Sequence, residues 1–419
     1  MNDLKKLIAG GIPAPLLQAY HLSLAYVGAF LFGYPSKRLR VIAVTGTKGK
    51  SSTTEFINAI FEANGEKTAL LNSIRFKTGK HSEPNLLRMS MPGRFFIQSF
   101  LSNALEAGCT TAILEMTSEG ARQFRHRDIE LDALVFTNLA PEHIESHGSF
   151  EAYADAKFEI GKQLVRSKKR PRVIVANADD AASMRYLTLP VEQAIPFTLT
   201  AQQPYGSSDA GGFFTFKELK METKLPGEFS LQNALAATSL TFAFHVPLQT
   251  IYNAILGLDR IPGRAEEIEA GQPFRVVVDY AHTPESLSAL YTAYGKRRKI
   301  CVLGSTGGGR DTWKRPVMGK IADENCDMVI LTNEDPYDED PKAIVAEVAG
   351  GMKRKPLIIM DRRAAIARAF ELAKADDAVL ITGKGTDPCI CIENGKKIPW
   401  SDAQVAREEI EKLPIRGQV

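Results

Sequence analysis

A short apolar run that leads into a turn rich in glycine, threonine and lysine constrains the fold of this chain most strongly. Val41-Ile42-Ala43-Val44 has the β-branched, apolar character of a buried parallel strand. Thr45-Gly46-Thr47-Lys48-Gly49-Lys50-Ser51-Ser52 follows it, and a helical pattern runs from Ser52 to Asn64. A strand, a glycine-rich turn and a helix in this order predict a phosphate-binding loop.

The residue types of this loop suit phosphate chemistry. Glycines let the backbone curl so that its N–H groups face phosphate oxygens, and the helix N-terminus adds partial positive charge. Lys50 can reach the outer phosphates, and Ser51 can ligate magnesium. Val44 stands where the strict P-loop pattern has a glycine, which argues against an ordinary GTPase or kinase. The predicted nucleotide-binding residues here are Gly46, Thr47, Lys48, Gly49, Lys50, Ser51 and Ser52.

The rest of the chain repeats the alternation of strand and helix. Apolar runs at 112–114, 133–136 and 172–175 are separated by helical patterns, which predicts an α/β domain with a mostly parallel sheet. Pro262-Gly263 breaks a helical pattern. A second series of short apolar runs follows and predicts a Rossmann-like domain. The expected organisation is a short apolar segment (1–38), a central ATP-binding domain (39–260) and a Rossmann-like C-terminal domain (261–419).

Composition excludes several classes of protein. Lys and Arg number 52 against 49 Asp and Glu, so a net charge of +3 argues against a nucleic-acid binder. The five cysteines are odd in number and lack a CxxC pair, which predicts reduced, buried thiols in a cytoplasmic protein. Residues 15–34 are apolar and interrupted by polar side chains, and their apolar run is short for a membrane span. They fit a helix packed on the following domain, or a weak contact with a membrane surface.

Several further motifs resemble one known family. In order along the chain, these motifs are Glu115-Met116-Thr117-Ser118, 137–143, Tyr153-Ala154-Asp155-Ala156-Lys157, 225–229, 279–284, 307–316 and 383–385. Together with the phosphate loop, they resemble the Mur ligases, which include the folylpolyglutamate synthetases. The segment from His143 to Gly148 is similar to the E-type, tripeptide-synthetase branch and favours it over the folate branch.

The resemblance implies roles for particular residues. Ser51, Glu115 and His143 are expected to ligate magnesium, and Lys157 to be carbamylated so that it holds a second magnesium. Sequence alone equally allows His143 as a loop residue and Lys157 as a surface lysine of an amphipathic helix. Lys50, Lys157, His143 and Arg264 form the expected catalytic set. The other residues implied to bind ATP are Asn138, Asn233, Arg264, Asp279, His282 and Lys314. Asn233 equally fits a helix-surface amide, Asp279 a strand-end cap, and His282 a structural loop histidine.

The family resemblance also implies a reaction. ATP and Mg²⁺ would convert a carboxylate to an acyl phosphate, which an amino acid then attacks to form an amide. The expected donor is a muramoyl-dipeptide precursor, and the expected protein is a monomer that acts on small molecules without nucleic acid. The alternatives are a ligase for another carboxylate, such as a folate or a peptide, and a nucleotide-binding scaffold without turnover.

The chain departs from the family pattern in three places. Fewer than forty residues precede the central domain, whereas E-type ligases carry a domain there that holds uridine diphosphate. Ser90-Met91-Pro92 replaces the Thr-Thr-Pro contact to the donor, and Glu334-Asp335-Pro336-Tyr337 lacks the arginine of the diaminopimelate-adding members. Acidic Asp338, Glu339 and Asp387 suit a cationic amino acid, although a solvated acidic loop explains them equally well. The expected substrate-binding residues are Ser90, Pro92, Asp335, Tyr337, Gly383 and Asp387.

Overall fold

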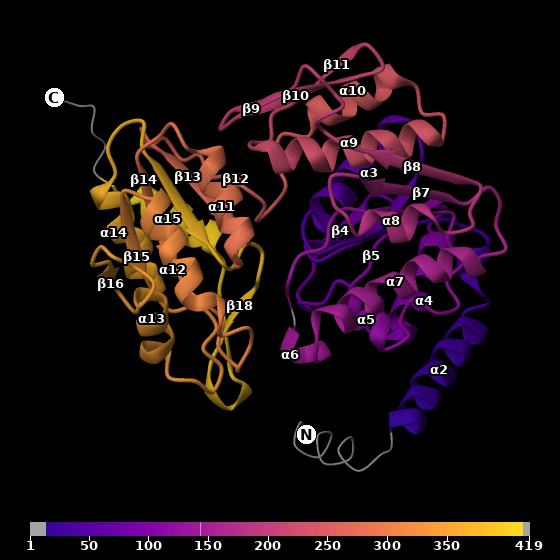
Figure 1. Cartoon of the computed structure of the whole chain (residues 1–419), viewed down its shortest axis with the longest axis horizontal. Helices are drawn as coiled ribbons and strands as arrows, with labels where there is room; N and C mark the ends of the chain where they lie inside the picture. The colour runs from indigo at the N-terminus through magenta and orange to yellow at the C-terminus, as the bar shows by residue number, and fades with distance from the viewer. Residues whose placement is uncertain (1–13, 143, 414–419) are drawn as a thin grey trace. The chain divides into compact units, whose positions relative to one another are not determined.

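A computed structural model describes residues 14–142 and 144–413 of the chain. These residues group into two compact units (Figure 1). The first unit takes in residues 14–141, 147–201 and 233–254. The second takes in residues 142, 144–146, 202–232 and 255–413. The sequence-based boundary between residues 260 and 261 stays a prediction.

An eight-stranded sheet with the order β4-β3-β2-β5-β1-β6-β7-β8 is the centre of the first unit. Its strands pair in parallel except at one edge, where β3 pairs antiparallel with both β2 and β4. The strands are β1 (Arg40–Thr45), β2 (Thr68–Leu71), β3 (Arg75–Thr78), β4 (His81–Pro84), β5 (Thr111–Glu115), β6 (Ala133–Phe136), β7 (Val173–Asn177) and β8 (Gln193–Phe197). Because β1 pairs with β5 and β6, the loop after β1 leaves from the middle of the sheet.

Helices complete the first unit. Side chains of α4 and α7 share one apolar core with β1, β5 and β6, and α3 packs on β1, β2 and β5. The helices are α2 (Ala14–Leu31), α3 (Lys50–Ala63), α4 (Arg94–Glu106), α5 (Ser118–Arg122), α7 (Phe150–Arg166) and α8 (Ser183–Leu187). Helix α6 (Ile144–His147) lies where the chain passes between the units, as do α9 (Glu228–Ala243) and α10 (Leu248–Gly257).

The second unit contains a six-stranded sheet with the order β12-β13-β17-β14-β15-β16. Five strands are parallel, and β12 is antiparallel at one edge. Helices α11 to α13 pack on one face, and α14 and α15 on the other (Figure 1). The elements are β12 (Glu266–Glu267), β13 (Arg275–Asp279), α11 (Pro284–Ala293), β14 (Lys299–Leu303), α12 (Lys314–Asn325), β15 (Met328–Leu331), α13 (Pro341–Ala349), β16 (Leu357–Ile358), α14 (Arg362–Leu372), β17 (Ala378–Thr382) and α15 (Asp402–Glu411).

Two small antiparallel sheets belong to the same unit. One contains β9 (Gly206–Ser208), β10 (Gly211–Phe216) and β11 (Leu219–Thr223), and the other pairs β18 (Cys389–Cys391) with β19 (Lys397–Pro399). The α/β fold class, with a mostly parallel central sheet and a Rossmann-like second sheet, is confirmed.

The cysteines differ from the sequence-based expectation. Cys301 on β14 and Cys326 after α12 form a disulfide, with their Cα atoms 6.3 Å apart. The expectation that all five are reduced thiols is therefore wrong for this pair. The two cysteines meet because the chain leaves β14, passes through α12 and returns to the side of β14. Their separation in the sequence does not predict this contact. Cys109, Cys389 and Cys391 are buried and form no disulfide in the described part of the chain.

Helix α2 packs on α4 through buried Ala25 and Ala29. It carries no charged residue, and Leu16, Tyr20, Tyr26, Val27, Phe30 and Leu31 are exposed. No helix in the described part of the chain is long and apolar enough to cross a membrane.

Candidate active site

The phosphate loop joins the end of β1 to the start of α3, as the sequence predicts. Gly46 has φ +147° because it passes close to β6: a Cβ there would lie 1.9 Å from Thr137 Oγ1. Gly49 is left-handed at φ +80°, and a Cβ there would lie 2.2 Å from Asn233 Oδ1. Only glycine fits both requirements at these positions. Because the loop has no side chain at these two positions, the backbone N–H groups at the start of α3 are left accessible to a phosphate.

Two asparagines predicted to contact the nucleotide lie against this loop. Asn138 accepts from Lys48 N at 2.8 Å through Oδ1, and its backbone carbonyl accepts from Thr47 N at 2.8 Å. Asn233 on α9 accepts from Thr53 Oγ1 at 3.3 Å. The structure thus brings both asparagines to the phosphate loop from distant parts of the sequence. Their contact with a nucleotide stays a prediction.

A buried carboxylate lies at the end of β5, beside the loop. Glu115 is 3 % exposed, and its Oε2 accepts from Ser51 Oγ at 2.8 Å and from Ser73 N at 2.9 Å. Its Oε1 accepts from Ser90 Oγ at 2.8 Å. Magnesium prefers oxygen ligands and keeps several waters or phosphate oxygens. The carboxylate and hydroxyl oxygens of Glu115 and Ser51 therefore fit that ion.

Lys157 on α7 is buried rather than a surface lysine, at 2 % exposure. Its Nζ donates to the Gly46 carbonyl at 2.6 Å and lies 4.7 Å from the centroid of the Tyr153 ring. The Tyr153 hydroxyl in turn lies 3.0 Å from Thr47 Oγ1. Helix α7 therefore contacts the phosphate loop through two side chains. Lys50 Nζ donates to the Thr47 carbonyl at 2.9 Å.

Other predicted nucleotide-side residues lie in the second unit. Asp279, at the end of β13, accepts from Ala265 N at 2.5 Å and from Ala281 N at 2.6 Å, which is the geometry of a strand-end cap. Arg264 lies over the Tyr280 ring, 4.7 Å from its centroid. Residues 264–265 therefore lie beside the end of β13.

His282 and Lys314 belong to the same unit. His282 Nδ1 lies 2.7 Å from the Tyr280 carbonyl, and its Nε2 lies 3.1 Å from Glu142 Oε1. Lys314 is buried at the start of α12. His143 lies outside the described residues, so its predicted role as a metal ligand stays a prediction.

Four of the residues predicted to bind substrate follow β15 and β17 in the second unit. Asp335 Oδ1 accepts from Lys384 Nζ at 2.8 Å and from Cys391 N at 2.8 Å, and both members of this ion pair are buried. Gly383, at φ +105°, leaves room for the Glu334 carboxylate: a Cβ there would lie 2.3 Å from Oε2. Burial raises the pKa of Glu334.

Neighbouring side chains shape this region further. Tyr337 lies beneath Arg310, whose guanidinium carbon is 5.1 Å from the ring centroid. Asp387 Oδ2 lies 3.5 Å from Lys384 Nζ. Four predicted substrate-binding residues thus lie along one connected stretch of the second unit: Asp335, Tyr337, Gly383 and Asp387. The other two, Ser90 and the buried Pro92, belong to the first unit.

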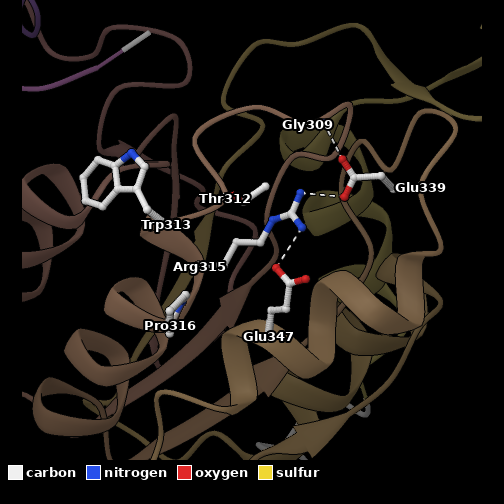
Figure 2. A pocket seen from close by; sticks show the side chains of 7 residues that line it. All are labelled: Gly309, Thr312, Trp313, Arg315, Pro316, Glu339 and Glu347. Carbon is white, nitrogen blue, oxygen red and sulfur yellow. Dashed lines mark hydrogen bonds and ion pairs between the residues drawn. The ribbon is translucent and has the colours of Figure 1, made fainter. Parts of the chain in front are cut away.

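A cavity of about 550 Å³ opens next to this stretch (Figure 2). Arg315 is almost fully buried there and pairs with Glu339 at 2.8 Å and with Glu347 at 2.9 Å. Trp313 and Thr312 also line this cavity. Glu339 is therefore paired with a buried arginine, while its own side chain stays partly exposed.

Sequence reasoning missed several residues of these clusters. Ser73 contacts both Ser51, with their hydroxyls 2.8 Å apart, and Glu115, but nothing in its local sequence marks it. Tyr153 lies in a segment that resembles the family, and its position on the same helical face as Lys157, four residues on, is a signal that sequence reasoning could have used. Lys384 lies within the Gly-Lys-Gly match, and only the structure shows that it is the buried partner of Asp335.

A glycine loop that opens a helix, with a buried carboxylate and hydroxyls beside it, defines an enzyme that uses a nucleoside triphosphate to activate its substrate. The family model of the Mur ligase middle domain matches residues 44–241, and that of the Mur ligase glutamate ligase domain matches residues 263–385. The chain belongs to the Mur ligase family. It is an ATP-dependent, ADP-forming amide ligase that acts on small molecules and uses Mg²⁺.

Curated relatives match nearly the whole chain. It is 35% identical to a UDP-N-acetylmuramyl-tripeptide synthetase of Roseiflexus sp. (strain RS-1), over 97% of this chain and 86% of the relative. It is 34% identical to a UDP-N-acetylmuramoyl-L-alanyl-D-glutamate–2,6-diaminopimelate ligase of Syntrophomonas wolfei, over 95% of this chain and 82% of the relative.

Solved structures show the same fold. A UDP-N-acetylmuramoyl-L-alanyl-D-glutamate–2,6-diaminopimelate ligase superimposes with a TM-score of 0.61 at 30% identity, over 89% of this chain and 78% of that one. The folylpolyglutamate synthase of Mycobacterium tuberculosis superimposes with a TM-score of 0.72 over 96% of this chain and 99% of that one. At 18% identity, that likeness concerns the fold alone.

Proposed function

We propose that this ligase adds an amino acid to the carboxylate of a muramoyl-dipeptide precursor of peptidoglycan. The relatives' names describe this class of donor. The observation that carries the proposal is the hydrogen-bonded series from Ser51 through Glu115 to Ser90. It connects the phosphate loop to the segment where the family pattern has its donor contact, so a donor carboxylate bound there lies beside the transferred phosphate.

Each residue of the site has a role in the proposed reaction. A donor carboxylate oxygen attacks the γ-phosphorus, ADP leaves, and Lys50 neutralises charge on the transferred group. Ser51 and Glu115 would hold one magnesium ion with His143, and Lys157, as a carbamate, a second. The amine of the amino acid then attacks the acyl phosphate, and the amide forms as phosphate and a proton leave.

The remaining predicted residues would bind the nucleotide. Asn138 and Asn233 lie at the phosphate loop, and Asp279 and His282 belong to the second unit. Arg264 and Lys314 would reach the γ-phosphate as cations.

Phosphate release from ATP tests the proposal. We expect release only when a muramoyl dipeptide and an amino acid are both present, and we expect the amide product in equal amount. Release that depends on a folate or another carboxylate, and not on the muramoyl dipeptide, would replace the proposed donor. A protein that binds ATP but never releases phosphate would be a scaffold.

The acceptor site favours a cationic amino acid over diaminopimelate. Tyr337 stands where diaminopimelate-adding members have an arginine, and a tyrosine hydroxyl supplies neither its charge nor its bidentate contact. Of the acidic residues nearby, Glu339 pairs with Arg315, and Asp338 accepts from Asn394 N at 2.8 Å. Asp387 lies 3.5 Å from Lys384 Nζ, but that lysine pairs more closely with Asp335, at 2.8 Å, so Asp387 is the strongest candidate to meet an ammonium group.

We therefore expect lysine to be preferred to diaminopimelate in a competition assay, and Tyr337→Arg to shift the product ratio towards diaminopimelate. Arg362 and Arg363 do not replace the missing arginine, because they pair with Asp402 and with Glu408 and Glu409. If the wild type prefers diaminopimelate, Arg310 above the Tyr337 ring is the cation that grips its second carboxylate.

We also propose that the exposed apolar face of α2 contacts membrane surfaces weakly, and that the protein is a cytoplasmic monomer. An uncharged helix that exposes Phe30 and Leu31 fits a shallow interfacial contact. We expect partial co-sedimentation with lipid vesicles, which Phe30→Gln should reduce. The control is Met184→Gln on α8, because Met184 is equally apolar and 60 % exposed. Equal sedimentation of both variants with the wild type would contradict a contact through α2.

A further inference from the structure

Two thiols of the second unit lie beside each other on one face of β18. Cys389 and Cys391 alternate along the strand, so their side chains leave it on the same side. Their Sγ atoms are 4.0 Å apart, and both residues are buried. No step of the proposed reaction uses either thiol. Two thiols at this spacing form a candidate site for reversible disulfide chemistry.

The backbone of β18 is hydrogen-bonded to residues 335–338, which we call the acceptor loop. Cys391 N donates to Asp335 Oδ1 at 2.8 Å, and the Cys391 carbonyl accepts from Tyr337 N at 3.1 Å. The same Asp335 oxygen accepts from the buried Lys384 ammonium group at 2.8 Å. A shift in the backbone of Cys391 therefore changes two contacts that position the acceptor loop.

A bond between the two sulfurs requires β18 to change shape. Residues two apart on an extended strand have Cα atoms about 6.6 Å apart, close to the upper end of the range of about 4.4–6.8 Å for disulfides. The sulfurs must also approach each other by about 2 Å from their separation of 4.0 Å. Contraction of the strand displaces the N–H and the carbonyl of Cys391. Because these groups hold Asp335 and Tyr337, the disulfide would loosen the acceptor loop.

The small sheet that carries the thiols gives an oxidant a way to reach them. Strand β18 forms a two-stranded sheet with β19, and β19 is exposed along its length. Pro399 pairs with Cys389 and has no N–H to donate. A two-stranded sheet is only marginally stable by itself, so it opens more easily than the six-stranded sheet. Opening exposes thiols that are buried in the closed form.

We propose that Cys389 and Cys391 form a modification site, at which a small disulfide such as oxidised glutathione converts them to an internal disulfide that weakens binding of the acceptor amino acid. One thiol loses its proton and attacks the oxidant, and one glutathione thiol leaves with that proton. The second cysteine then displaces the other glutathione. One S–S bond forms as another breaks, and two hydrogens pass to the oxidant. Transient disulfides of this kind sense redox state in cytoplasmic proteins.

The effect on the amino acid rests on the proposed function, whereas formation of the disulfide does not. Peptide mapping of the full chain therefore tests the modification without turnover. The protein is incubated with oxidised glutathione, and the remaining thiols are blocked with N-ethylmaleimide in denaturant. We expect the peptide that contains residues 389–391 to lose two hydrogens and to escape the maleimide. Reduced glutathione should reverse both changes.

Cysteine variants serve as controls for the mapping. Cys389→Ser should form no internal disulfide, and Cys389→Ala takes its place if the serine variant does not fold. Cys109→Ser removes a buried thiol of the first unit and should leave oxidation at 389–391 unchanged. A glutathione adduct in place of the internal bond, or maleimide on both thiols at the highest ratio of oxidised to reduced glutathione, would overturn the inference.

Turnover assays test the effect on the acceptor. The disulfide should raise the KM for the amino acid about tenfold or more, the size of a lost hydrogen bond to a charged group, and leave the KM for ATP unchanged. Because linkage is reciprocal, saturating lysine should raise the ratio of oxidised to reduced glutathione at half-oxidation about tenfold. Cys389→Ser should keep its KM for the amino acid in oxidised glutathione.

The outcomes separate this inference from the proposed function. An equal KM for the amino acid in the oxidised and reduced wild type would contradict control of the acceptor loop. If the reduced protein forms no amide from the muramoyl dipeptide, the proposed function is wrong. In that case the mapped disulfide and its reversal still decide whether the modification site exists.

Discussion

Lys50→Ala is expected to abolish phosphate release from ATP while leaving the fold intact. Lys50 opens α3, and we propose that its ammonium group reaches the outer phosphates. Loss of a group that stabilises charge in a transition state lowers kcat by a factor of about 100 to 1000. Its ammonium group donates to the Thr47 carbonyl at 2.9 Å and the residue is only half-buried, so its removal should change the melting temperature little.

The matched control for Lys50→Ala is Lys80→Ala, which removes an exposed lysine after β3. The control should keep wild-type phosphate release. Steady-state release and thermal unfolding, measured on both variants, check the prediction. Near-normal release by folded Lys50→Ala would remove Lys50 from the mechanism.

Lys157→Ala is expected to lose most activity and to regain part of it with formate or acetate. A small carboxylate can occupy the position that a carbamate would fill between magnesium and α7. The structure adds a competing explanation, because the Lys157 amine itself donates to the Gly46 carbonyl at 2.6 Å. If this amine matters for the loop, methylammonium should rescue the variant and formate should not.

The two rescue series therefore distinguish a carboxylate from an ammonium group at the same position. Lys162→Ala is the matched control, because Lys162 lies on the same helix but is exposed and pairs with Glu159 at 2.6 Å. It should remain fully active without additives. Full activity of Lys157→Ala at the start would exclude both roles.

Local patterns predicted the phosphate loop and four strands of the first unit's eight-stranded sheet, β1, β5, β6 and β7. The apolar run before Thr45 is β1, and the glycines that follow have the positive φ values that the loop requires. Both signals are local: burial of a parallel strand demands apolar residues, and the turn demands glycine. The assignment of 202–232 to the second unit has no such signal, because it depends on contacts far along the chain.

The same limit applies to the site. Sequence motifs identified Ser51 and Glu115, and in the structure Ser51 Oγ donates to Glu115 Oε2 at 2.8 Å. The motifs did not identify Ser73, which lies between these two residues in the sequence. The acidic residues after Pro336 suggested an open negative surface, yet Glu339 is paired with a buried arginine from α12. The net charge near a site depends on charged side chains from other elements that fold beside it. The composition of one loop does not reveal those side chains.

The division of the chain between the units has a consequence for truncated proteins. Asp209, between β9 and β10, contacts both Arg275 and Arg297, which come much later in the sequence. A fragment that starts at residue 261 would keep the two arginines and lose the carboxylate, together with all of the β9–β11 sheet. Excising the glutamate ligase domain by a single cut would therefore yield a weakened fragment, whereas co-expression with a peptide of residues 202–232 offers a route to reassembly by complementation.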